Sequence, residues 1–179
     1  MKPPAAASLL VVALACPAWA EAQDTEWNRY TLEDLGGVFI EFEGDDVCDA
    51  AGVNAAAYEA DVSMKLIEAD VDVLTRDEML THPAMPELRI SLDCVKGPSG
   101  SAGTMAYAVG LRVQQAAQML RDTQITLPEA VTWYTTAVGV TSDGAAVEAV
   151  GATLMELIDG FAAAWRAIHE EPGSGQGAA

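Results

Sequence analysis

The sequence LRISLDC at residues 88–94 decides the fold class, because apolar and polar side chains alternate along its whole length. A period of two places Leu88, Ile90, Leu92 and Cys94 on one face of a β-strand and the polar residues on the other. We therefore expect a strand whose apolar face is buried against another layer of structure.

Four further stretches predict strands, by alternation or by their content of β-branched and aromatic residues. They are residues 38–43, 71–74, 105–119 and 130–141. In the third of these, one face carries Tyr107, Val109, Leu111 and Val113. The opposite face carries small or polar side chains, namely Ala106, Ala108, Gly110, Arg112 and Gln114. We expect this second face to be open to solvent.

Two amphipathic helices are predicted from apolar residues spaced three and four apart. The first covers about 54–69, with an apolar stripe formed by Val53, Ala57, Ala60, Met64, Ile67 and Val71. The second ends near His169 and has a broader stripe formed by Val147, Val150, Leu154, Leu157, Phe161, Trp165 and Ile168.

The resulting order, β-α-β-β-β-β-α, predicts an α+β fold. We expect a two-layer α/β sandwich with a mostly antiparallel sheet of about five strands and both helices on one face. The single domain covers 37–169, after an irregular or briefly helical segment at 21–36. Residues 170–179, EEPGSGQGAA, predict a disordered tail.

The first 20 residues have the features of a secretory signal peptide. Lys2 precedes the apolar run SLLVVALA at 8–15, and Ala18-Trp19-Ala20 is a small-x-small cleavage pattern, so cleavage is expected between Ala20 and Glu21. The run is too short to span a bilayer, which takes about 20 residues, and we expect no transmembrane segment. The prediction is a periplasmic or secreted protein, with a lipoprotein anchored at Cys16 as the alternative.

Signal cleavage would leave two cysteines, Cys48 and Cys94, and in an exported protein such a pair predicts a disulfide. If the strands before Cys48 and up to Cys94 ran antiparallel, the two residues would begin at opposite ends of the sheet. The alternative is a pair of buried free thiols.

The net charge of −18 makes nucleic acid an improbable partner, because phosphate binding needs a basic surface. It leaves a cationic partner or an unknown protein partner in the cell envelope. Five carboxylates, at Glu41, Glu43, Asp45, Asp46 and Asp49, suggest a hard-cation site such as calcium. They lack the order of an EF-hand loop, so we favour a solvated acidic loop over a metal site.

No other motif predicts chemistry, and we expect no catalytic residue, cofactor or metal site. The two histidines, His82 and His169, have no zinc-ligand spacing around them, and no serine has the elbow of a hydrolase. Trp133 and Tyr134 are adjacent in a predicted strand, so one of them faces outward and is a candidate contact residue.

The core pattern resembles an uncharacterised family of small exported bacterial proteins. The matching stretches are 66–73, 88–92, the sequence YAV at 107–109, the sequence TW at 132–133, and 161–165. These motifs imply a fold and no activity.

Three functions follow as hypotheses. We favour a non-enzymatic interaction or accessory protein acting through the open sheet face or a sheet edge. The alternatives are a small-ligand or cation-binding protein using the acidic 41–49 loop, and an unrecognised hydrolase.

Overall fold

A computed structural model describes residues 19–98 and 103–169 of the chain. Most of the predicted signal peptide, the alternative anchor Cys16 and the predicted tail at 170–179 lie outside the described residues. Among the residues described, no helix is both long and apolar enough to cross a membrane.

The fold is α+β, with one mixed sheet of six strands in the order β1-β6-β5-β4-β2-β3. The pairs β1–β6, β6–β5 and β5–β4 are antiparallel. The pairs β4–β2 and β2–β3 are parallel. The bounds are β1 Trp19–Gln23, β2 Gly37–Gly44, β3 Asp72–Val73, β4 Glu87–Lys96, β5 Thr104–Gln118 and β6 Thr126–Ser142. The five predicted strands are all present, and β1 is an addition.

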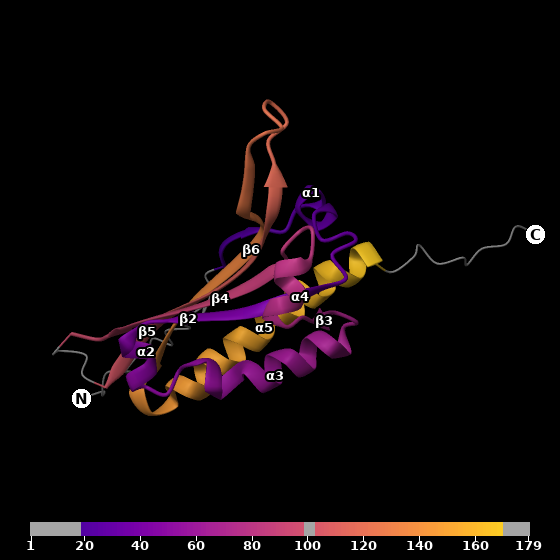
Figure 1. Cartoon of the computed structure of the whole chain (residues 1–179). Helices are drawn as coiled ribbons and strands as arrows, with labels where there is room; N and C mark the ends of the chain where they lie inside the picture. Colours follow the sequence, from indigo (N-terminus) through magenta and orange to yellow (C-terminus); the bar gives the residue numbers. More distant parts are fainter. Residues whose placement is uncertain (1–18, 99–102, 170–179) are drawn as a thin grey trace, which may run out of the picture.

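Two long helices, α3 (Ala55–Glu68) and α5 (Ala146–His169), lie together on one face of the sheet (Figure 1). This is the predicted two-layer arrangement. The shorter helices are α1 (Glu26–Tyr30), α2 (Asp46–Ala50) and α4 (Arg76–Thr81), and a 3-10 turn at Asp143–Ala145 leads into α5. The far part of the β5–β6 hairpin projects away from the two layers (Figure 1).

The core lies between the sheet and the two helices. The predicted strand faces are buried as expected, with Ile90, Leu111 and Val113 at 0–1% exposure. Helix α5 contributes Leu154, Phe161 and Trp165 to this core. Phe161 packs edge-on against Trp133 of β6, with 5.2 Å between the ring centroids. Burying aromatic and aliphatic side chains in this way is the main source of stability for such a domain.

The apolar stripe predicted for the first helix is wrong, although the helix itself is present. Met64 and Ile67 are 54% and 62% exposed, and Ala57 and Ala60 are also exposed. The buried face is formed by Tyr58, Val62 and Leu66, at i, i+4 and i+8. Tyr58 anchors this face to α5, because its hydroxyl donates a hydrogen bond to the carbonyl of Val147 at 3.0 Å. Burial raises the pKa of the Tyr58 phenol.

The prediction for 21–36 missed strand β1, and no helix was predicted between the strands at 71–74 and 88–94, where α4 lies. Helices α1 and α4 each begin after a threonine whose hydroxyl accepts a backbone N–H, Thr25 for α1 and Thr75 for α4. At α4, Glu78 completes a capping box, which stabilises a helix too short to show an apolar period.

Candidate functional site

The open face of the sheet is built from aligned rows of side chains that cross the strands. One row runs Glu41, Arg89, Arg112 and Tyr134 across β2, β4, β5 and β6. Another runs Val95, Ala106 and Val140 across β4, β5 and β6. Antiparallel pairing places directly opposed residues on the same face. The face therefore has a charged part towards the hairpin and an apolar part towards the other end.

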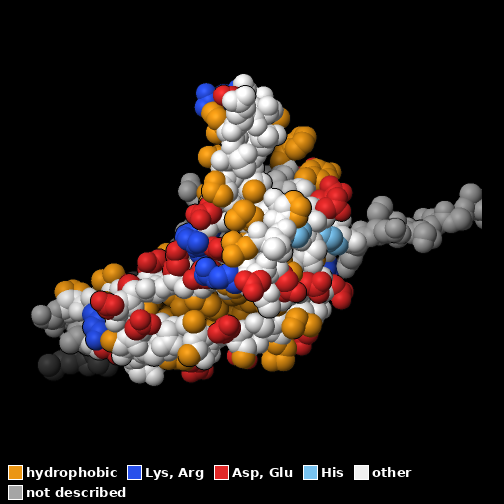
Figure 2. Space-filling model, in the orientation of Figure 1, with side chains coloured by type: hydrophobic (Ala, Val, Ile, Leu, Met, Phe, Trp, Pro, Cys, Tyr) orange, Lys and Arg blue, Asp and Glu red, His pale blue; other side chains and the backbone are white. Residues whose placement is uncertain are grey.

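The charged part is a network of ion pairs. Glu43 accepts from Arg89 at 2.8 Å and from Arg112 at 2.7 Å, and Arg89 also donates to Glu87 at 2.5 Å. The hydrogen bond to Glu87 raises the pKa of Arg89 above its ordinary value. The arginine Nε of Arg112 is buried and has no hydrogen-bond partner. Figure 2 shows basic and acidic side chains gathered below the projecting hairpin, beside apolar side chains.

The apolar part is a shallow groove of about 500 Å³. The small residues Ala106 and Ala108 of β5 form its floor. Its sides are formed by larger residues of the neighbouring strands, namely Val95, Val138 and Val140. Val140 is 74% exposed and Val95 is 67% exposed. Clustered exposed apolar side chains are typical of a surface that another molecule covers.

The two adjacent aromatic residues of β6 have opposite environments. Trp133 is buried in the core and donates from its indole nitrogen to Asp24 at 2.9 Å. Tyr134 lies on the open face with Arg112 and Thr136, around a smaller hollow. Of the two candidate contact residues, only Tyr134 is placed where a partner could reach it.

The five carboxylates of 41–49 do not form one cluster. Glu41 pairs with Arg76 at 3.2 Å, and Glu43 pairs with Arg89 and Arg112. Asp45 accepts the backbone N–H groups of Cys48 at 2.7 Å and Cys94 at 2.9 Å. Glu41 and Glu43 lie on the same face of β2 but have different arginine partners. The start of α2 directs Asp45 to the backbone of Cys48 and Cys94 instead.

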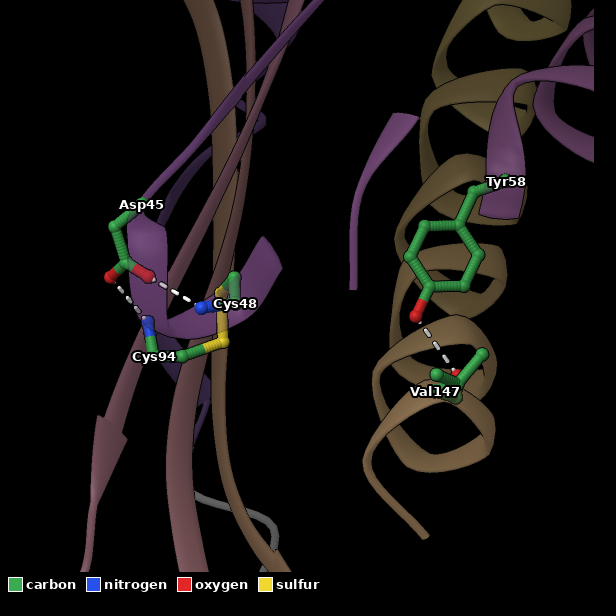
Figure 3. Close-up of a disulfide and its surroundings, with 5 residues drawn as sticks. All are labelled: Asp45, Cys48, Tyr58, Cys94 and Val147. Atoms are coloured by element: carbon green, nitrogen blue, oxygen red, sulfur yellow. Dashed lines mark hydrogen bonds between the residues drawn. A yellow bond between two sulfur atoms is a disulfide. The ribbon is translucent and has the colours of Figure 1, made fainter. Parts of the chain in front are cut away.

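Cys48 and Cys94 are joined by a disulfide, with 5.1 Å between their Cα atoms (Figure 3). Because β2 and β4 are parallel, α2 after β2 lies beside the end of β4, which removes the topological obstacle to this bond. Asp45 bridges the same two residues through their N–H groups (Figure 3). The N–H of Cys94, with those of Cys48 and Val47, holds the pKa of Asp45 below its ordinary value.

Asp45, Cys48 and Cys94 are close enough to resemble a metal site. Both sulfur atoms are already bonded to each other, and the carboxylate already accepts backbone hydrogen bonds. Thiolates are the form of cysteine that binds metals, so this grouping acts as a structural clamp.

The outer edge of β6 is covered by two elements, the short helix α1, which lies within the segment expected to be irregular or briefly helical, and the strand β1, which was not predicted. Near Thr132 it is closed by α1, whose Asn28 donates from Nδ2 to the Thr132 carbonyl at 2.7 Å. Further along, β1 pairs antiparallel with it, placing Gln23 opposite Tyr134, Ala20 opposite Thr136 and Trp19 opposite Ala137. From Val138 to Ser142, no strand within the described part of the chain pairs with this edge.

Asp24 links α1 to β6 by hydrogen bonds. It accepts from Arg29 at 2.7 and 2.6 Å as well as from Trp133. Burial alone would raise the pKa of Asp24, but the hydrogen bonds from Arg29 and Trp133 outweigh it and lower that pKa. A single aspartate with no periodic signal around it could not be recognised from the sequence.

The two histidines have structural partners. The Nδ1 of His82 accepts the N–H of Ala84 at 3.1 Å. His169 stacks on Trp165 at 4.3 Å and its Nδ1 lies 3.0 Å from the Trp165 carbonyl. Neither histidine is brought to the open face.

Comparison with known proteins gives no assignment: no protein-family model, no curated protein and no solved structure matches this chain. The resemblance to small exported bacterial proteins therefore stays a prediction.

Proposed function

We propose that this chain is an exported, non-enzymatic interaction protein of the bacterial cell envelope, which binds an extended segment of a partner protein as an added strand on the β6 edge. The observation that carries the proposal is the position of β1. Its residues Trp19 and Ala20 cover the edge, and they lie on the signal side of the predicted cleavage point before Glu21.

Cleavage there would remove two of the three strand pairs that β1 makes. The pairs opposite Thr136 and Ala137 would be lost, and Gln23 opposite Tyr134 would be the last one remaining. The α1 contact at Thr132 would persist, because Asn28 belongs to the processed chain. Processing would therefore remove the cover opposite Thr136 and Ala137. Together with 138–142, which no described strand pairs on this side, these residues would form the uncovered far half of the edge, and the near half would stay closed.

The uncovered half lacks the usual protection of a sheet edge. Residues 131–142, VTWYTTAVGVTS, contain no charged residue and no proline, and they are rich in β-branched side chains. Proteins normally protect such edges with charges, prolines, bulges or very short strands. An unprotected edge with alternating apolar side chains offers both backbone hydrogen bonds and side-chain contacts to an added strand.

The chemistry of the occupant follows from β1 and from the charge of the chain. β1 shows that the edge accepts an antiparallel strand containing an alanine and a tryptophan. The net charge of −18 disfavours a second copy of the same chain and favours a segment flanked by lysine or arginine. We therefore expect an uncharged extended core with basic flanks.

The test uses a photo-cross-linking residue at Ser142 in the chain that begins at Glu21, in a periplasmic extract of the native host. We expect one saturable adduct, whose cross-linked peptide has an uncharged core and basic flanks. Val140→Lys should reduce the adduct about tenfold, because a lysine beside the edge repels a basic strand and discourages pairing.

Val95→Lys is the matched control, since Val95 is in the same row, on the same face and similarly exposed, but lies two strands from the edge. Equal loss with both variants, loss with Val95→Lys alone, or no adduct at all would refute strand addition at β6. A dimer of this chain as the adduct would refute the proposed partner.

A further inference from the structure

Two adjacent glutamines of β5 are equally buried but differently satisfied. Gln114 and Gln115 are each 8% exposed. Gln115 donates from Nε2 to the Thr31 carbonyl at 2.8 Å and to the Thr132 hydroxyl at 2.7 Å. The Oε1 of Gln114 is buried and has no hydrogen-bond partner. Buried polar atoms are nearly always paired, so an unpaired one calls for an explanation such as a missing ligand.

Gln114 lines a cleft of about 210 Å³ on the open face, beside the base of the projecting hairpin. Strand alternation places Gln115 on the opposite side, against the N-terminal segment. The apolar walls of the cleft are formed by Met79 and Leu80 of α4, by Met85, and by Pro128. The cleft therefore combines one buried acceptor with an apolar lining.

The wall formed by residues 84–86 is held in place by backbone hydrogen bonds. The Ala84 carbonyl accepts from Ala116 of β5 at 2.6 Å, and the Pro86 carbonyl accepts from Phe39 of β2 at 3.0 Å. Between them, Met85 has a φ of +47°, a conformation that side-chain-bearing residues rarely adopt. Strained residues of this kind are found more often at binding sites.

The charges of the cleft select for a cation. Glu41, Glu87 and Glu129 line it, with Arg76 and Arg89 as the only basic residues of the lining. Arg89 is held by Glu87 and Glu43, and Arg76 by Glu41. Glu129 lies beyond ion-pair distance of every basic residue that the structure describes, although its charge also helps to raise the pKa of Arg89. Three carboxylates against two guanidinium groups leave a net negative charge.

We infer that this cleft binds a small primary amine with an apolar body. The ammonium group would face Glu129 and would donate to the Oε1 of Gln114 once that side chain turns this buried oxygen towards the cleft. The body would contact Met79, Leu80 and Met85. The volume is below the roughly 300–1,000 Å³ of sites for drug-sized ligands, so the ligand is small. This site is separate from the β6 edge and does not depend on the proposed function.

The test compares two probes of the same shape and opposite charge, 2-phenylethylamine and 3-phenylpropionate, by calorimetry and by the melting temperature of the purified protein. The amine should give saturable heat and raise the melting temperature, since a ligand that binds the folded state stabilises it. The carboxylate should do neither. Equal responses to both probes, or none to the amine, would refute the inference.

Two matched substitutions locate the site. Gln114→Leu should abolish the amine response without lowering the melting temperature, because it replaces an unpaired polar group by an apolar one of similar size. Gln115→Leu should lower the melting temperature and keep the amine response, because it removes two hydrogen bonds on the other face. An amine response that persists in Gln114→Leu, or destabilisation by Gln114→Leu as large as that by Gln115→Leu, would overturn the assignment.

Discussion

The two faces of the sheet differ in what holds their side chains in place. On the face covered by α3 and α5, Leu111, Val113 and Trp133 are 0–1% exposed and packed against helices. On the open face, Arg89 and Arg112 share the carboxylate of Glu43, and the side chains of Val95 and Val140 are 67% and 74% exposed. The packing that stabilises the fold is therefore on the covered face, and the side chains of the open face are available to contact another molecule.

The two ends of the sheet differ in a similar way. At one end, β3 is only two residues long and its neighbour β2 carries Glu41 and Glu43, so charge and short length protect that edge. At the other end, β6 is long and uncharged over 131–142, and its protection comes from α1 and β1. Only the second protection depends on residues that predicted processing removes.

The largest expected effect on the free energy of unfolding is the difference between substitutions on the buried and the exposed side of α3. Leu66→Ala should reduce the free energy of unfolding by about 2–5 kcal/mol, because Leu66 is fully buried. Ile67→Ala, one position along and 62% exposed, should change it by less than about 0.5 kcal/mol. Urea unfolding of both variants measures the contrast. Similar losses from the two would mean that Ile67 is covered by something in solution.

The next effect concerns the disulfide at the end of the parallel strands. Replacing Cys48 and Cys94 by alanine together should reduce the free energy of unfolding by about 3–4 kcal/mol, since the bond closes a loop with a sequence separation of 46. The open-face ion pairs should not change. Unfolding of the wild type with and without a reductant gives the same comparison, and an unchanged midpoint would contradict it.

The smallest effect is a pH dependence. The pKa of Asp45 is lower in the folded protein than its ordinary value of 3.8. Its contribution to stability is therefore complete above that value and is lost as pH falls from about 4 through the folded pKa. Asp45→Asn keeps the helix cap and removes this titration.

Urea midpoints at about pH 6 and about pH 2.5 measure the prediction. The loss of stability between the two pH values should be smaller in Asp45→Asn than in the wild type. An equal loss in both proteins would show that Asp45 does not titrate differently in the folded state. Asp24, whose pKa is also lowered, should contribute in the same direction.

Much of the fold could be predicted from periodicity. The β4 pattern and the apolar face of β5 indicated the buried side correctly, and so did the α5 stripe from Val150 to Trp165. Val147, the first residue of that predicted stripe, is 42% exposed. Helix α3 carries two apolar stripes, one through Met64 and Ile67 and one through Val62 and Leu66. The period was right and the face was wrong, because only contact with α5 and the sheet decides between two stripes of the same helix.

The candidate sites could be predicted far less well. Tyr134 and the open face followed from strand alternation. The β1 strand, the Asp24 contacts and the unpaired Gln114 had no local signal, since each depends on residues brought together from distant parts of the chain. The acidic residues of 41–49 indicated a cation site, yet Glu41, Glu43 and Asp45 each have separate partners.

The sequence by itself determined the α+β class, the strands and helices that carry a period, and the chemical character of each face, because those properties repeat every two or about 3.6 residues. The tertiary structure alone decided which stripe of α3 is buried, that β2 and β4 run parallel and so bring Cys48 to Cys94, and that the β6 edge is covered by β1. Those facts rest on pairing between residues far apart in the chain, which no local pattern encodes.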